Sequence, residues 1–181
     1  MISIAVHASA TLGASLVFAA AMELTFPLSA SLATYFGFET YGLLLFLPHG
    51  VRVLCAYMFG WRSVLYLLPA IAYYATSQAS TEDYILSLIL GLCAQVSCVL
   101  AFYALGAIRA IENNFLDAPI RSDSLILAAI AGAAFNATSH FVIYDGSSLT
   151  ASSIFVGDVF GFAVILILAM ALARIYSRLP Q

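Results

Sequence analysis

Long apolar runs separated by short polar stretches make up most of the chain. A helix needs about 20 predominantly apolar residues to cross a bilayer, and it satisfies its own backbone hydrogen bonds there. The pattern therefore predicts an all-α, polytopic transmembrane helical bundle of about six spans, with residues 1–181 forming a single domain. The predicted spans are residues 2–22, 41–60, 63–76, 84–108, 125–144 and 154–173.

Residues 25–40 are more polar than the runs on either side. They contain Pro27, Glu39, several Ser and Thr, and aromatic residues such as Tyr35. Aromatic rings favour the membrane–water boundary. We therefore predict a loop with an interfacial helical piece, following a first span that Glu23 closes. A re-entrant element is the alternative.

The arginines at the ends of the predicted spans indicate an orientation. With six spans and a cytoplasmic N-terminus, five arginines fall on the cytoplasmic side; they are Arg62, Arg109, Arg121, Arg174 and Arg178. The opposite loops then carry acidic residues and no arginine. This separation follows the positive-inside rule, so both termini are predicted to be cytoplasmic.

Composition supports lipid as the main solvent. The chain is 64% hydrophobic and 8% charged, whereas soluble domains have about 45–50% apolar and about 25% charged residues. The net charge is −3, and nucleic-acid binding needs a basic patch. We therefore expect contact with membrane lipid and no nucleic-acid partner.

Two charged residues, Arg52 and Asp158, lie inside predicted spans. A charge at the bilayer centre costs about 2.5–3.5 kcal/mol on insertion scales, so both should face the interior of the bundle. Arginine favours planar, two-pronged contact with a carboxylate. The two residues are predicted to form a structural ion pair, or a pair that binds a ligand between them.

Other polar residues inside the spans have spacings that place them on shared helix faces. His49 lies three residues before Arg52, and Asn136 lies four before His140. We predict that one intramembrane polar cavity collects the side chains of His49, Arg52, Gln95, Asn136, His140 and Asp158. The alternative is that single polar residues only join helices through hydrogen bonds.

Pro48 and Gly50 flank His49 and predict a break in the second span. Broken helices at membrane depth often line binding sites. A haem held by His49 and His140 is the cofactor alternative, although no cofactor or metal is expected. The sequence shows no catalytic constellation, so we do not expect an enzyme.

Gly157 and Gly161 form a small-xxx-small pattern in the last span. Such a pattern allows a neighbouring helix to approach closely. The neighbour is predicted to be a helix of the same chain or of a second copy.

Three stretches together resemble the bacterial MASE1 integral membrane sensor domain. Residues 47–62, with Pro48 and Gly50, are similar to its "Pro-x-Gly, apolar run, Gly-x-Arg" element, and residues 68–70 fall where that family often continues. Residues 156–161, with Asp158, are similar to its late "Gly-Asp-x-x-Gly" span. The resemblance implies a multi-span sensory module in the bacterial inner (cytoplasmic) membrane.

Three functions remain open at this point. The first is a non-enzymatic sensory protein that binds a small molecule or a partner in the polar cavity. The second is an accessory or structural subunit that packs against a protein partner in a larger membrane complex. The third is the substrate-binding subunit of a vitamin-type transporter, which the size and span count suggest.

Overall fold

The computed structural model describes residues 4–36, 44–78, 83–109, 122–143 and 148–178. Within these ranges the chain is all-α, as predicted, with six helices. They are α1 (Ile4–Phe36), α2 (Leu47–Phe59), α3 (Arg62–Gln78), α4 (Tyr84–Arg109), α5 (Ser122–Ile143) and α6 (Ser148–Tyr176).

Four of the described helices, α1, α4, α5 and α6, are long and apolar enough to cross a membrane. α2 and α3 have 13 and 17 residues, which is short of the roughly 20 that a full crossing requires. The structure therefore supports a multi-pass membrane protein in contact with lipid. Six full crossings stay a prediction.

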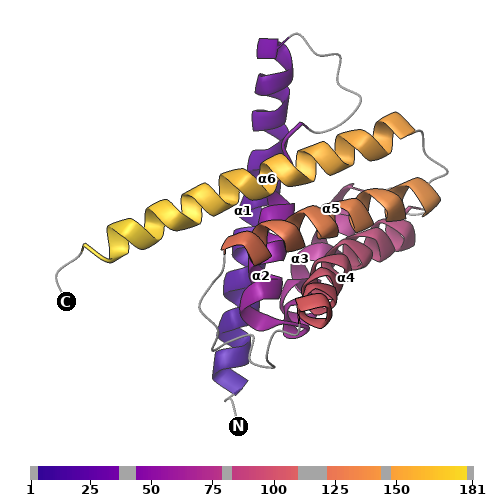
Figure 1. Cartoon of the computed structure of the whole chain (residues 1–181). Coiled ribbons are helices and arrows are strands. Elements are labelled where there is room, and N and C mark those ends of the chain that lie inside the picture. The colour runs from indigo at the N-terminus through magenta and orange to yellow at the C-terminus, as the bar shows by residue number, and fades with distance from the viewer. Residues whose placement is uncertain (1–3, 37–43, 79–82, 110–121, 144–147, 179–181) are drawn as a thin grey trace.

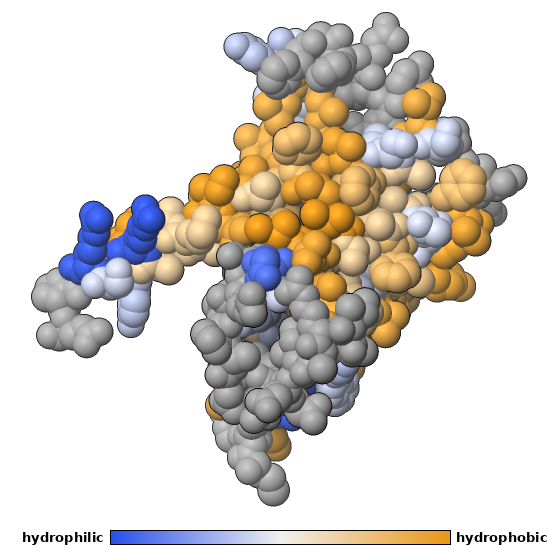
Figure 2. All heavy atoms as spheres, in the orientation of Figure 1, coloured by the Kyte–Doolittle hydropathy of each residue, from blue (hydrophilic) through white to orange (hydrophobic). Residues whose placement is uncertain are grey.

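The short helix α2 is the centre of the molecule, because it contacts each of the other five described helices. Figure 1 shows α6 crossing steeply in front of α1, with its C-terminal part extending away from the other helices. Most of the coloured atoms in Figure 2 are hydrophobic, and hydrophilic atoms gather at the C-terminal end of α6. That end carries the exposed Arg174 and Arg178.

The first helix does not end near Glu23, where the sequence predicted a boundary. α1 runs on through Pro27 for 33 residues in all. Residues 25–36 are therefore helical and not a loop, while residues 37–40 lie outside the described ranges. Two of the polar residues that favoured a loop, Thr25 and Ser29, are buried on the inward face of this helix, whereas Ser31 and Thr34 are exposed and bond to carbonyls one turn earlier in the helix.

Thr25 and Ser29 explain why a polar stretch stays helical here. They lie four residues apart and are 0% and 1% exposed. Thr25 Oγ1 accepts a hydrogen bond from the N–H of Leu47 at 3.2 Å, and Ser29 Oγ accepts one from the N–H of Leu44 at 2.8 Å. A buried backbone N–H without a partner costs about 1–3 kcal/mol. The two hydroxyls therefore stabilise the non-helical segment that leads into α2.

The proline of the predicted break marks a helix start. α2 begins at Leu47, and Pro48 lies in its first turn, where the missing N–H of proline removes no helical bond. Gly50 is helical, and a Cβ atom on it would lie 2.6 Å from Cβ of Ile165 in α6. Gly50 thus permits close packing of two helices and does not bend the chain.

Gly157 and Gly161 bring α6 against the same segment. The N–H of Phe46 donates to the carbonyl of Gly157 at 2.9 Å. A Cβ atom on Gly161 would overlap the carbonyl group of Phe46 and lie 2.8 Å from the nitrogen of Leu47. Both glycines therefore pack against their own chain, at the start of α2.

Candidate functional site

The polar face of α2 meets α5 and α6 in a buried hydrogen-bonded cluster. Asn136 Nδ2 donates to Asp158 Oδ2 at 2.8 Å, and His49 Nδ1 lies 3.5 Å from the same oxygen. His49 Nε2 lies 3.0 Å from the carbonyl oxygen of Ala129. This cluster joins three helices through side chains that the sequence analysis had selected.

The predicted ion pair between Arg52 and Asp158 is not formed. No carboxylate of the described residues lies within 4.0 Å of the Arg52 guanidinium. Its central carbon lies 5.2 Å from the ring centre of Phe18 and 5.6 Å from that of Phe46, which is cation–π distance. Asp158 instead meets His49, one helical turn before Arg52, because that turn of α2 faces α6.

Four buried polar atoms of this region have no hydrogen-bond partner within the described part of the protein: His49 Nδ1, Arg52 Nε, Asn136 Oδ1 and Asp158 Oδ1. Arg52, Asn136 and Asp158 are 6%, 3% and 1% exposed. A buried polar group without a partner costs about 1–3 kcal/mol, and more when it is charged. These atoms are themselves covered, so a bound molecule that supplies complementary atoms would remove this cost by displacing the groups that cover them.

The side chains of Arg52, Asn136 and Asp158 reach one cavity of about 370 Å³. All six helices contribute to its wall, with one representative residue from each being Phe18, Arg52, Ile71, Leu90, Asn136 and Asp158. Pockets for small molecules occupy about 300–1,000 Å³ and are mostly apolar, with a few converging polar groups. This cavity has that character and lies at the small end of the range.

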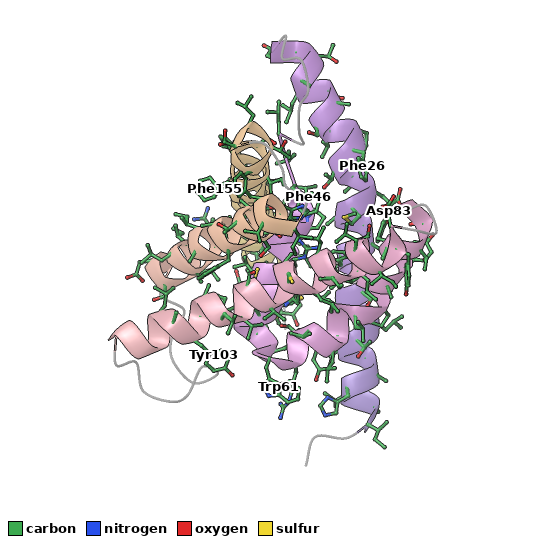
Figure 3. The ribbon with its side chains drawn as sticks, turned by 90° about the vertical axis from the view of Figure 1, so that its right-hand side faces the viewer. Phe26, Phe46, Trp61, Asp83, Tyr103 and Phe155 are labelled. Atoms are coloured by element: carbon green, nitrogen blue, oxygen red, sulfur yellow. The ribbon has the colours of Figure 1, made fainter. Side chains whose placement is uncertain are left out.

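Polar and apolar residues both line the cavity. Arg52, Asn136, Asp158 and the half-buried His140 form the polar part. The apolar part includes aromatic rings, among them Phe26 of α1 and Phe46, which Figure 3 shows near each other in the middle of the molecule. A ligand with a polar head and an apolar body would match both kinds of lining residue.

Two residues of the predicted cavity lie outside its wall. His49 is not part of the wall, and its Nδ1 lies 3.5 Å from Asp158 Oδ2. Gln95 belongs to a different contact, in which its Nε2 donates to Ser63 Oγ at 2.8 Å and joins α4 to α3. The structure therefore brings together four of the six predicted side chains at the cavity and assigns the other two to helix–helix contacts.

The geometry of His49 argues against the haem alternative. Its two ring nitrogens face the carbonyl of Ala129 and the carboxyl group of Asp158, which leaves neither directed at an iron. Among the described residues, no group of three or more His, Cys, Asp or Glu side chains is placed to hold a metal ion.

A second cavity of about 300 Å³ lies at another end of the molecule, near the α2–α3 turn. Its wall includes Trp61 and Tyr103, which Figure 3 shows well below Phe26 and Phe46. Its cation, Arg62, is exposed. It lacks the buried, unpartnered polar atoms that mark the central cavity.

Sequence reasoning missed Phe18, Phe46, Thr25 and Ser29. The aromatic residues gave no signal, since rings are common in apolar helices. The two hydroxyl residues did give one: a spacing of four residues places them on one helix face.

Neither a protein-family model, nor a curated protein, nor a solved structure matches this chain. The resemblance to the MASE1 domain therefore stays a prediction.

Proposed function

We propose that this chain is a multi-pass protein of the bacterial inner membrane, with cytoplasmic termini, that binds a small molecule in the cavity between its six helices. The binding role is that of a sensory module, in line with the resemblance to the MASE1 domain. Arg52, Asn136, His140 and Asp158 form the polar part of the binding site, and His49 orients Asp158.

One observation supports this proposal above the others. Arg52 is 6% exposed, has no carboxylate at ion-pair distance among the described residues, and borders a cavity of about 370 Å³. Burying a cation without a counter-charge destabilises the folded protein. A bound ligand with an anionic group would offset this cost. If this residue only fixed the register of the helices, a neutral side chain would do so at a lower free-energy cost of burial.

The test is whether the purified protein retains a small molecule through this arginine. The full chain is extracted in mild detergent, and native mass spectrometry is followed by denaturation and small-molecule analysis. We expect a bound compound of defined mass in the wild type and in the control Arg62→Met, which removes an exposed arginine, and its loss in Arg52→Met. Equal retention by Arg52→Met, or a wild type that releases no small molecule, would contradict the proposal.

A further inference from the structure

We infer that the central cavity binds an apolar amino acid in its zwitterionic form, with the carboxylate at Arg52 and the ammonium group at Asp158 and Asn136. This inference rests on the proposed small-molecule site and names the chemical class of its ligand.

Arg52 provides the anion-binding end. The rings of Phe18 and Phe46 lie 5.2 Å and 5.6 Å from the guanidinium carbon, so aromatic faces border this group where a counter-ion would otherwise lie. Arg52 Nε has no hydrogen-bond partner among the residues that the structure describes. A guanidinium presents a planar fork of N–H donors that matches the two oxygens of a carboxylate.

Asp158 and Asn136 provide the cation-binding part of the site. Asp158 Oδ2 is already engaged by Asn136 Nδ2 and faces His49 Nδ1. Asp158 Oδ1 and Asn136 Oδ1 are two acceptors that receive no hydrogen bond from any described residue. An ammonium group has three donors and no acceptor, so one such group can serve both oxygens.

The charges favour a ligand with both groups. A monoanion would pair with Arg52 and leave Asp158 Oδ1 without a donor, and a monocation would do the reverse. Charge pairs are worth more away from bulk water, where the effective dielectric constant is lower. A zwitterion satisfies both ends and adds no net charge to the buried site.

The remaining wall and the volume define the side chain. Phe18, Met22, Phe26, Ile71 and Leu90 line the apolar part of the cavity. A volume of about 370 Å³ is near the lower limit for small-molecule pockets. It suits a single aromatic ring or a branched aliphatic chain better than a multi-ring cofactor.

Binding is measured by isothermal titration on the full chain in lipid nanodiscs, with L-phenylalanine and L-leucine. The matched probes are 3-phenylpropionate, which lacks the amine, and phenethylamine, which lacks the carboxylate. We expect at least one amino acid to bind, with both truncated probes weaker by roughly 100-fold, because each leaves a buried charged group unpaired. The control Arg62→Met should bind as the wild type does.

Two variants assign the ends of the ligand. In Arg52→Met, phenylalanine should lose its advantage over phenethylamine; in Asp158→Asn, it should lose its advantage over 3-phenylpropionate. If Arg52→Met does not fold, as judged by gel filtration and circular dichroism, Arg52→Lys is used in its place. Lysine keeps the positive charge but lacks the planar pair of N–H donors. Arg52→Lys should still favour phenylalanine over phenethylamine, by a smaller factor.

The outcomes separate this inference from the proposed function. Truncated probes that bind as tightly as phenylalanine, or no binding of either amino acid, overturn the inference. If native mass spectrometry then still shows a different molecule that depends on Arg52, the proposed function stands alone. If no retained molecule depends on Arg52, both fail.

Discussion

Replacing Gly161 with alanine tests the contact between α6 and the start of α2. An added Cβ atom would overlap the carbonyl group of Phe46 and lie 2.8 Å from the nitrogen of Leu47. Both neighbours are backbone atoms, so no side-chain rotation relieves the clash. α6 must move outward, which stretches the 2.9 Å bond from Phe46 N–H to the carbonyl of Gly157.

The size of the effect follows from overpacking. Extra carbon atoms in a closely packed core cost about 1–3 kcal/mol, and occasionally more. For a chain of this length, about 1 kcal/mol shifts the unfolding temperature by about 2–4 °C. Gly161→Ala should therefore lower the unfolding temperature by roughly 2–12 °C, followed by circular dichroism in detergent.

Gly13→Ala is the matched control, because a Cβ atom there meets nothing within 4 Å on the exposed face of α1. Alanine is favoured over glycine in a helix by about 0.8–1 kcal/mol, so this variant should be slightly more stable than the wild type. The reasoning is refuted if Gly161→Ala unfolds at the wild-type temperature or above it.

Three further predictions concern two buried hydrogen bonds and the orientation in the membrane. Thr25→Val removes the acceptor of the Leu47 N–H and should destabilise the protein by about 1–3 kcal/mol, whereas Thr34→Val, at an exposed site, should change little; equal unfolding temperatures would contradict the role of Thr25. Ser63→Ala leaves the buried amide of Gln95 without its partner and should cost about 1–3 kcal/mol by the same measurement, while an unchanged unfolding temperature would show this bond to be dispensable. A C-terminal fluorescent protein that folds only in the cytoplasm should fluoresce in bacterial cells, and a dark fusion of normal abundance would reverse the proposed orientation.

The helical class and the importance of the Pro48–Arg52 stretch could be read from the sequence. Apolar runs of sufficient length leave little choice but helices in lipid, and a buried His, Arg and Asp must face inward. Asn136 and Asp158 do meet. This contact could be anticipated, because so apolar a chain offers few polar side chains that can bind the buried carboxyl group of Asp158.

Helix boundaries and specific pairings could not be predicted in the same way. Pro48 is compatible with a kink or a helix start, and only the neighbouring helices decide which. In the sequence, Thr25 and Ser29 are typical of a loop. Their role is evident only once the structure places the N–H groups of Leu47 and Leu44 next to their hydroxyls. His49 and Arg52 are equally plausible partners for Asp158, and a difference of one helical turn in depth selects His49.

The placement of Asp158 and Gly157 on α6 has a consequence for how the protein is made. α2 leaves the ribosome about a hundred residues before these partners do. Until then, His49 lacks its contact with Asp158, and the N–H of Phe46 lacks the carbonyl of Gly157. Both groups must therefore be kept away from the acyl chains, either at the translocon or beside a chaperone. A chain interrupted before Ser148 would expose both groups, and membrane proteases should degrade it quickly.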